Sequence, residues 1–502
     1  MKILSVDQIR AADAYTIEHE PIASIDLMER ASEAFVEAFV ELPIIKTHIR
    51  VVCGGGNNAG DGMVIARLLH ERNFEVQVWV LDMGSEGSED FRINRHRWSQ
   101  IGDIIVIRDI NDFPEIDTHQ VLIDAIFGSG LNREVTGLAA EVILRMNESQ
   151  VEIVAVDMPS GLFADQPVST SSAVVCAAHT LSFQNPKLAF LLPENNKYVG
   201  NWLVLEIGLS QEFLEQASTD HYTLEASMLQ PFRQPRKKFA HKGTFGHALL
   251  VSGSKGKIGA SLLAARAALR CGLGLLTVHL PACGYLILQT ALPEAMIQLD
   301  EHDSLCSHVP WSPNFTCAGI GPGLGTDKVT VKALKDLLQE VNRPLVVDAD
   351  ALNIISEHRE LLQILPAGSI LTPHPKEFER LAGSWDNDFV RLQLQKKLSS
   401  DFNLIVVFKG AHTTITFPEG EVLFNTTGNP GMGTAGSGDV LTGMITGLLA
   451  RSGNPRMAAL AGVFVHGFAG DLAAEEVGEI SMIAGDITQQ IGPAFKKLGL
   501  LL

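Results

Sequence analysis

The sequence predicts two α/β domains in one chain. At 502 residues, the chain is longer than one hydrophobic core usually supports. In both halves, short apolar, β-branched runs alternate with helical patterns, as in parallel sheets covered by helices. Residues 211–242 interrupt this alternation and hold no convincing strand, so we place the domain junction there, with domains over 1–215 and 225–502.

Composition and charge narrow the class of protein. With 46% hydrophobic and 19% charged residues, the chain resembles globular proteins with large cores. A net charge of −19 argues against nucleic acid or an anionic membrane as the main partner. The six cysteines form neither a CxxC pair nor a zinc spacing, which predicts reduced thiols in a cytosolic protein. We expect no secretory signal and, without a run of about 18 apolar residues, no transmembrane helix.

The first half begins with two helical patterns, over 6–20 and 25–41. Because the strand-like runs that follow are continuously apolar rather than alternating, they predict a buried parallel sheet in a layered α/β arrangement. We expect helices at 61–73 and 138–149, and strands at 48–55, 74–82, 103–109, 119–128, 152–161, 179–183 and 201–209.

The second half repeats this plan. Helices are predicted at 259–272 and 328–341, and long helical patterns at 439–453 and 456–478 follow near the end. For the basic run RQPRKK at 233–238, in the junction, we favour a solvated linker over a phosphate-binding patch. Strands are expected at 245–254, 275–281, 314–323, 343–351, 369–375, 403–411 and 413–420.

A glycine-rich loop, GGGNNAGDG, covers 54–62 directly after the first predicted strand. Gly54, Gly56 and Ala59 match the relaxed dinucleotide-binding fingerprint. Asp82 ends the next strand, about where a ribose-binding acid would lie. The two helices ahead of the strand and the extra polar groups inside the loop argue against an ordinary dinucleotide site.

Polar side chains also follow other strands of the first half. Asp124, Asp157 and Ser160 lie at predicted strand ends. Because the carboxyl ends of parallel strands share one edge of a sheet, these groups can converge with Asn58. Such oxygen ligands suit a hard cation, and Asp157 can then serve as a general acid or base. For any single aspartate we favour a cap of a helix or turn, but for the whole set we favour a site.

The stretch NPGMGTAGSGDVLTG, residues 429–443, leads a glycine-rich loop into a helix. Free backbone N–H groups and the helix dipole at such a start attract an anion, although no GK[ST] follows to make a Walker A motif. Asp439 puts a carboxylate at the same place. If the phosphate lies over the N–H groups of 436–438, Asp439 can face an acceptor hydroxyl. The helix dipole keeps Asp439 ionised. The Asp439 carboxylate takes the proton of the hydroxyl as the hydroxyl oxygen attacks phosphorus.

Further polar groups follow strands of the second half. For Lys409, after an apolar strand and before a glycine, a nucleotide phosphate partner is favoured over a surface position. A structural and a functional role are equally supported for His374, whereas His466, in an apolar helical pattern, is interpreted as a core histidine. The remaining groups at strand ends are Asp348, Asp350 and Asn425.

In this order, the motifs resemble a known family over nearly the whole chain. GGGNNAGDG, VDMPSG and SFQNPKLAF look like the epimerase domain of the NAD(P)H-hydrate repair family. GPGLG, VVDADALN, TPHPKEFERL, FKGAHT and NPGMGTAGSGDVLTG resemble the family's ADP-dependent dehydratase. Ala59, Met158 and Lys376 depart from the residues common in the family, but none of them removes a polar group to which we assign a role.

The resemblance implies a Rossmann-like three-layer α/β/α domain, followed by a ribokinase-like α/β domain. The first domain would interconvert the R and S forms of NAD(P)H hydrate, in which water has been added at C6 of the nicotinamide ring, with Asp157 as the catalytic residue. A potassium ion would be held by Asn58, Asp124 and Ser160. The substrate contacts carried over by the motifs are Asn57, Asn58, Ala59, Gly60, Asp61, Gly128, Ser129, Gly130, Leu131, Asn132, Arg133, Glu134 and Asp157.

The second domain would dehydrate the S form with ADP, giving AMP and phosphate, by phosphorylation of the ring hydroxyl and loss of phosphate. Asp439 would be catalytic and would line the hydrate with Ala260, Gly323 and His374. The resemblance also implies NADHX, NADPHX and ADP as partners, no nucleic-acid or membrane partner, and a homo-oligomer in the cytoplasm. With magnesium on its phosphates, the nucleotide would contact Lys409, Gly410, Ala411, His412, Thr413 and Gly438.

Two other functions fit parts of the pattern. A ribokinase-type small-molecule kinase fused to a non-catalytic binding domain would have the same GSGD loop and acid. It would accumulate a phosphorylated product in place of repaired cofactor. Alternatively, a first domain that only binds or scaffolds would need neither Asp157 nor Asn58.

Overall fold

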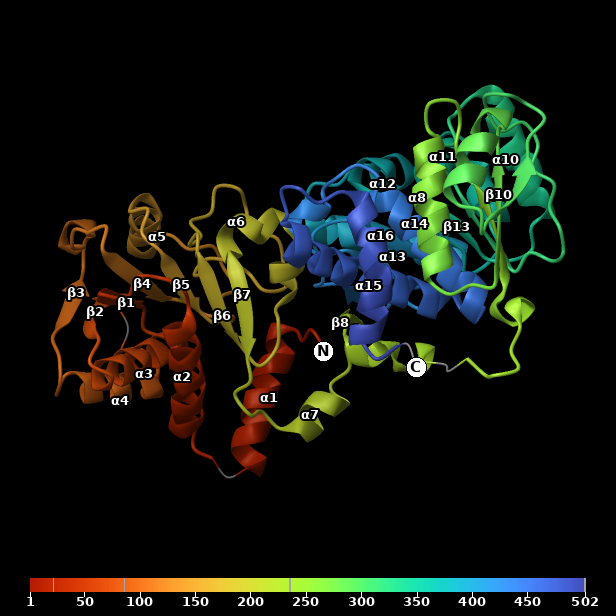
Figure 1. The fold of residues 1–502 in the computed structure, drawn as a ribbon. Coiled ribbons are helices and arrows are strands. Elements are labelled where there is room, and N and C mark those ends of the chain that lie inside the picture. The colour runs from red at the N-terminus through yellow and green to blue at the C-terminus, as the bar shows by residue number, and fades with distance from the viewer. Residues whose placement is uncertain (21, 85, 234–235, 501–502) are drawn as a thin grey trace. The chain divides into compact units, whose positions relative to one another are not determined.

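The computed structural model describes residues 1–20, 22–84, 86–233 and 236–500, and the chain divides into two compact units. The N-terminal unit comprises Lys2–Thr219 with Asn387–Phe389. The C-terminal unit comprises Met1, Asp220–Asp386 and Val390–Leu502. Both units are α/β, as predicted (Figure 1).

The sheet of the N-terminal unit has seven parallel strands in the order β3-β2-β1-β4-β5-β6-β7. The order reverses between β1 and β4, and ligands of parallel sheets bind at such a switch point, beyond the carboxyl ends of the strands. All strands predicted for this half are present: β1 (His48–Cys53), β2 (Glu75–Leu81), β3 (Ile104–Ile107), β4 (Gln120–Ala125), β5 (Ile153–Val156), β6 (His179–Phe183) and β7 (Asn201–Leu205).

Helices cover both faces of this sheet. On one face, α2 (Ser24–Glu41), α3 (Asn57–Glu71) and α4 (Glu89–Trp98) share a core with the strands. On the other face, α5 (Leu138–Glu148) buries its apolar stripe. The unit is therefore the predicted three-layer α/β/α sandwich. The remaining helices are α1 (Val6–His19), begun by a capping box at Ser5 and Gln8, α6 (Asn196–Val199) and α7 (Gln211–Gln216).

The sheet of the C-terminal unit has ten strands in the order β11-β10-β9-β12-β13-β14-β15-β16-β17-β8. Only β16 runs antiparallel to its neighbours. The strands are β8 (His221–Thr223), β9 (His247–Val251), β10 (Leu275–Leu280), β11 (Met296–Leu299), β12 (Cys317–Ile320), β13 (Leu345–Val347), β14 (Ile370–Leu371), β15 (Ile405–Phe408), β16 (Thr414–Thr416) and β17 (Val422–Phe424).

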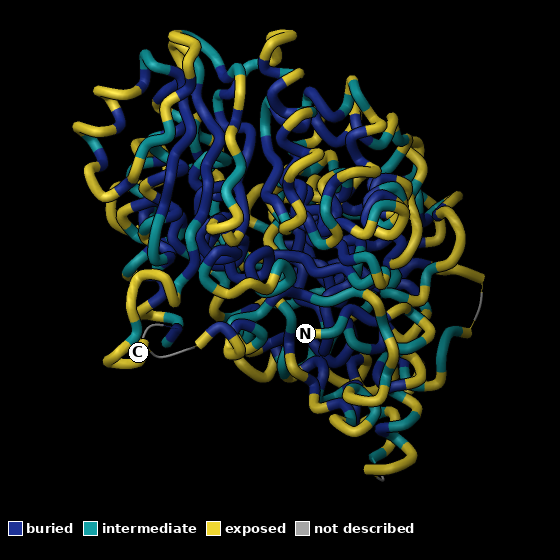
Figure 2. The backbone as a smooth tube through the Cα atoms, turned by 90° about the vertical axis from the view of Figure 1, so that its right-hand side faces the viewer, coloured by how far each residue is buried: buried dark blue, intermediate teal, exposed yellow. Residues whose placement is uncertain are grey.

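Two separate apolar cores hold helices on the two faces of this second sheet. One contains α8 (Ile258–Arg270), α14 (Ser437–Ser452), α15 (Pro455–Val477) and α16 (Ala484–Lys497). The other contains α10 (Lys328–Glu340), α11 (Ala349–Glu357), α12 (Pro375–Ala382) and α13 (Asp388–Phe402), while α9 (Tyr285–Ala291) contributes Leu288 to the first core. In Figure 2 the buried stretches form dark blue runs joined by exposed yellow loops. Short 3₁₀ helices cover Ile110–Asp112, Leu188–Leu191, Pro193–Asn195, Ala226–Phe232, Lys242–Phe245, Ala282–Gly284, Arg359–Ile364 and Pro430–Met432.

The prediction that 211–242 holds no strand is wrong. Strand β8 lies in this stretch and pairs with β17, so it belongs to the second sheet. It is only three residues long, and its partner lies far along the chain, so no local pattern marks it. Strands β11 and β17 were also not predicted, and both are short. Of the RQPRKK run, residues 234–235 lie outside the described residues.

Within the part of the chain that the structure describes, α15 alone is long and apolar enough to cross a membrane. Its most apolar window is 78% buried inside the unit. The helix packs against α14 and α16, and its alanines, valines and Phe464 belong to the core. Packing within the unit therefore accounts for its apolar composition.

Candidate active sites

A cavity of about 650 Å³ lies in the N-terminal unit. Its walls come from one face of α1, the start of α3, the loop after β4 and the residues that follow β5 and β6. Among the predicted substrate contacts, it is lined by Asn57, Asn58, Asp61, Gly128, Ser129, Gly130, Leu131, Asn132, Arg133 and Asp157.

Asp157 and Lys187 form a buried ion pair at this cavity. The Lys187 ammonium donates to Asp157 Oδ1 over 2.5 Å and also to Ser182 Oγ and the Phe183 carbonyl, which uses its three donors. Burial by itself would raise the pKa of Asp157, but Lys187 outweighs this effect and holds the pKa below its usual range. The backbone of Asp157 is in the left-handed region, with φ of 64°, which aspartate tolerates better than most residues.

Asp13 and Asp61 also line this cavity, and neither forms an ion pair within the part of the chain that the structure describes. Burial, together with the negative charge of Asp157, raises the pKa of Asp13 to about 6. Burial and the charges of Asp157, Asp13 and Asp90 raise the pKa of Asp61 well above its usual range. The carboxyls of the cavity therefore differ in pKa, since that of Asp157 is lowered and those of Asp13 and Asp61 are raised, a common feature of acid–base sites.

Asp124, Ser160 and Asn58 lie at the carboxyl ends of β4 and β5 and the start of α3. Ser160 donates to Asp124 through its hydroxyl over 2.6 Å and its backbone N–H over 2.7 Å. Burial raises the pKa of Asp124 to about 6, although these hydrogen bonds oppose it. Asn58 Oδ1 lies so close to Gly128 that a Cβ there would be 2.9 Å away, and the buried Nδ2 of Asn58 has no hydrogen-bond partner among the described residues.

In the C-terminal unit, the loop before α14 turns through Gly436, whose φ is 90°. A side chain there would be strained and would also contact Leu263, so the turn requires glycine. The first N–H groups of α14 have no intrahelical partner and face outward from the helix start. Asp439 lies in this first turn. Burial, and after it the charge of Asp348, raises the pKa of Asp439 to about 6. Asp439 therefore remains largely ionised at neutral pH. Burial nevertheless outweighs the helix dipole, which we expected to have the larger effect on this pKa.

Lys409 lies beside the same helix start. Its ammonium donates to Asp348 Oδ1 over 2.7 Å and lies 3.8 Å from Glu377 Oε2. A Cβ on Gly438 would be 3.6 Å from the Lys409 ammonium, so this charge is next to the loop. Thr442 donates to the other oxygen of Asp348 over 2.5 Å and ties α14 to the end of β13.

The remaining predicted residues of the second site surround this cluster. A Cβ on Gly323 would be 3.2 Å from Ala260 Cβ, so these two residues are neighbours. Asp350 pairs with Lys257 over 3.2 Å. His374 caps α12, since its Nδ1 accepts from the backbone N–H groups of Lys376 and Glu377.

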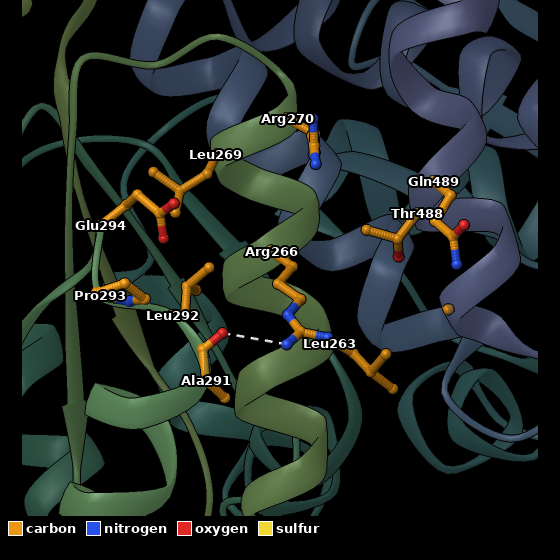
Figure 3. Close-up of a pocket in the computed structure, with 11 residues that line it drawn as sticks. Leu263, Arg266, Leu269, Arg270, Ala291, Leu292, Pro293, Glu294, Thr488 and Gln489 are labelled. Atoms are coloured by element: carbon orange, nitrogen blue, oxygen red, sulfur yellow. Dashed lines mark hydrogen bonds between the residues drawn. The ribbon is translucent and has the colours of Figure 1, made fainter.

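A second cavity of about 650 Å³ lies elsewhere in the C-terminal unit, between α8, α16 and the segment after α9 (Figure 3). Its lining contains no residue predicted for either site. Arg266, which points into it, donates to the Ala291 carbonyl over 3.1 Å. Leucines and other apolar groups share its walls with Arg266, Arg270, Glu294, Thr488 and Gln489.

Comparisons with known proteins match each unit separately. Residues 24–189 match the family model of the YjeF-related protein N-terminus, and residues 248–493 match that of NAD(P)H-hydrate dehydratase. Over 97% of its length the chain is 35% identical to the bifunctional NAD(P)H-hydrate repair enzyme of Moorella thermoacetica, 95% of which is covered. The chain belongs to the bifunctional NAD(P)H-hydrate repair enzymes.

Other members of this repair-enzyme family are similarly close. The Escherichia coli enzyme is 32% identical over 96% of this chain, and 91% of that enzyme is covered. Among solved structures, an ADP/ATP-dependent NAD(P)H-hydrate dehydratase from Bacillus subtilis, co-crystallised with ATP and Mg²⁺, is 29% identical, with a TM-score of 0.49. It covers 56% of this chain and 100% of its own.

The structure places most predicted site residues together, with exceptions. Ala59 and Gly60 pack inside the N-terminal unit, where a Cβ on Gly60 would clash with Met28, and they do not line the cavity. Glu134 also lies outside the lining and accepts from Ser172. Lys409 and Gly438 are adjacent, whereas Gly410, Ala411, His412 and Thr413 form the turn between β15 and β16, closed by Thr413 donating to the Gly410 carbonyl.

Sequence reasoning gave no role to Lys187 or Asp13. Lys187 stands in SFQNPKLAF, where polar residues precede it in the sequence and nothing local marks it as buried. Asp13 stands among alanines on a short helix ahead of the first strand, where only the fold shows that it faces the cavity. His466 is a buried core residue, as interpreted, and its Nε2 lies 3.0 Å from the Ser437 carbonyl.

Proposed function

We infer that the N-terminal unit interconverts the R and S epimers of NAD(P)H hydrate and that the C-terminal unit dehydrates the S epimer with ADP. The products would be NAD(P)H, AMP and phosphate. The two activities complement each other, because hydration yields both epimers and the dehydratase uses one. The observation that carries this inference is the family membership over 97% of the chain, with an acidic, buried site in each unit.

For epimerisation we propose that Asp157 acts as the proton acceptor. Lys187 keeps it ionised, and the cavity beside it is large enough for the nicotinamide end of the substrate. The start of α3 and the 128–133 loop would then hold the substrate through backbone N–H groups and the polar side chains of Asn57 and Asn132.

Asn58, Asp124 and Ser160 fit a potassium ion. They offer an amide, a carboxylate and a hydroxyl oxygen with one formal charge among them, a donor set that suits a monovalent cation. A bound monovalent cation would supply positive charge beside the substrate. Asp124→Ala should abolish potassium binding and weaken epimerisation. Crystals of the unaltered protein grown in potassium that contain only water between these groups would contradict this assignment.

For dehydration we propose that Asp439 takes the proton of the C6 hydroxyl as that oxygen attacks the β-phosphorus of ADP. Lys409 and the N–H groups at the start of α14 would meet the negative charge that develops on the phosphoryl group. The carboxylates of Asp348 and Asp350, both close to Asp439, fit a magnesium ion carried by the phosphates, which would neutralise part of their charge. Loss of phosphate from C6 and of a proton from C5 then restores the C5=C6 double bond of the ring.

Purified protein supplied with mixed NADH-hydrate epimers tests the whole proposal. With ADP, recovery of NADH absorbance should proceed to completion, because epimerisation feeds the S form. Recovery that stops at the S fraction would indicate an inactive N-terminal unit, and accumulation of a stable phosphorylated product would indicate a kinase. The same experiment with ATP and with NADPH hydrate determines the preferences.

Three properties that the resemblance implies remain proposals. We place the protein in the cytoplasm, where its six unpaired cysteines would stay reduced. We propose a homo-oligomer, testable by light scattering of the purified chain. We also propose that 1–215 and 225–502 function as separate domains.

A further inference from the structure

Inversion at C6 requires proton transfer on both faces of the nicotinamide ring. The hydroxyl leaves from one face as water and so needs a proton, and the water that adds to the other face must lose one. The epimerase site as described has a single proton-transfer group, Asp157. A second group is therefore needed, and this reasoning rests on the proposed epimerase function.

Most other charged groups of the cavity are unsuited to this role. Lys187 is 1% exposed and its three donors are occupied. Arg10 and Arg133 carry guanidinium groups, which donate hydrogen bonds but do not accept a proton. Asp90 is held by a hydrogen bond from Ser24 over 2.7 Å.

Asp13 lines the same cavity as Asp157, from a different element, and the charge of Asp157 acts on it. It lies in the middle of α1, on the face that turns Ile9, Ala14 and Ile17 toward the cavity. No ion pair or hydrogen bond of its side chain is found with any residue that the structure describes, and a mid-helix position excludes a capping role. A half-buried acid on an apolar helix face costs stability, so its presence calls for a function.

We propose that Asp13 is the second proton-transfer group of the epimerase site and acts on the face of the nicotinamide ring opposite Asp157. Protonated Asp13 gives its proton to the C6 hydroxyl. The C6–O bond breaks, water departs, and the N1 lone pair forms an N1=C6 iminium bond. A water then attacks the other face of C6, the iminium electron pair returns to N1, and Asp157 takes the proton released. The reverse reaction exchanges the two roles, and nothing is oxidised or reduced.

The pKa values of the carboxyls that line the cavity support this assignment. Asp13, with a pKa of about 6, can release and regain a proton near neutral pH, whereas burial and the charges of Asp157, Asp13 and Asp90 raise the pKa of Asp61 well above its usual range. The pair Asp13–Asp157 is active when it carries one proton. Activity should therefore fall about tenfold per pH unit above pH 6, as this proton is lost. The charged groups that face Asp13 from the surrounding elements are Asp157, Lys187, Asp61, Asp90, Arg10 and Arg133.

The test measures conversion of one purified NADH-hydrate epimer into the other without ADP, so that the C-terminal unit consumes neither. Asp13→Asn should lower the enzymatic rate by ~10²–10⁴-fold and remove the decline above pH 6. Asp13→Glu, which keeps a carboxyl, should recover part of the rate and the decline. Glu18→Gln, on an exposed part of the same helix, is the matched control and should retain the full rate.

Three results would overturn the role of Asp13. The first is a full rate in Asp13→Asn. The second is an equal loss in Asp13→Asn and Asp13→Glu with an unchanged pH profile, which would indicate packing alone. The third is disappearance of the high-pH decline in Asp61→Asn, which would place the proton on Asp61. If the unaltered protein fails to interconvert the epimers, the epimerase function itself fails.

Discussion

The two proposed catalytic aspartates, Asp157 buried and Asp439 half-buried, have pKa values that move in opposite directions. Asp157 has Lys187 at 2.5 Å, which holds its pKa below the usual range in spite of burial. Among the described residues Asp439 has no ion-pair partner, since the Lys409 ammonium is bound to Asp348, and its pKa rises to about 6. Burial alone therefore does not decide the charge of an active-site acid. The decisive factor is whether a nearby cation is still available to it.

The largest expected effect tests the unpaired aspartate. Asp439→Asn keeps the shape of the side chain but removes the base, so dehydration should fall by ~10²–10⁴-fold while ADP binding is unchanged or tighter. Epimerisation in the same protein should keep its rate. Single-turnover dehydration and calorimetric ADP titration measure these quantities. If ADP binding is lost together with activity, Asp439 mainly recruits the metal, and if activity barely changes, Asp439 is only a helix cap.

The second prediction tests the paired aspartate. Lys187→Met leaves Asp157 as an uncompensated buried charge, so the free energy of unfolding of the N-terminal unit should fall by about 3–5 kcal/mol. Hydrogen exchange of β5 and β6 in the full chain measures this change. The double variant Lys187→Met with Asp157→Asn is the matched control and should recover much of the loss. Equal stability of single and double variants would contradict the pairing argument.

The third prediction is that Asp439→Asn, the variant expected to lose dehydration, has a more stable C-terminal unit. Asp439 has a pKa of about 6 in the folded chain against an ordinary 3.8, so the folded state binds the proton more tightly. The contribution of Asp439 to the free energy of unfolding is fully present below pH 3.8 and is lost as the pH rises through 6. Asp439→Asn should therefore stabilise the C-terminal unit by up to about 3 kcal/mol at pH 7, at 1.36 kcal/mol per pKa unit. Hydrogen exchange of α14 should show the gain disappear near pH 4, and a gain that persists there would exclude ionisation as its cause.

The smallest expected effect concerns the boundary between the units. Separate chains 1–215 and 225–502 should keep their own activities, and mixing should restore nothing that each lacks alone. A chain of 225–502 loses β8, including the bonds from Val422 to the Asp220 carbonyl and from Leu224 to the Phe424 carbonyl. A chain starting at Asp220 should therefore be more stable by about 1–3 kcal/mol, at 0.5–1.5 kcal/mol per hydrogen bond. Denaturant midpoints of the two chains measure the difference.

The sequence was sufficient to predict the continuously apolar strands and the glycine-rich loops at strand ends, since both depend on local patterns. It failed for β8, which is three residues long and acquires its identity from β17. It also missed Lys187 and Asp13. A lysine buried by an ion pair and an acid exposed to a cavity both result from packing between distant segments, and neither leaves a local pattern that distinguishes it from a surface residue.

The pairing of Asp157 with Lys187 also has an evolutionary consequence. A single substitution of either residue leaves a lone buried charge, so the pair can be lost only by crossing a less stable intermediate. Asp439 is under no such constraint, because we expect one substitution there to remove the activity and to make its unit more stable. Among descendants that no longer need repair, we expect the second unit to decay first into an inactive nucleotide-binding module, while the first unit keeps its charged pair intact.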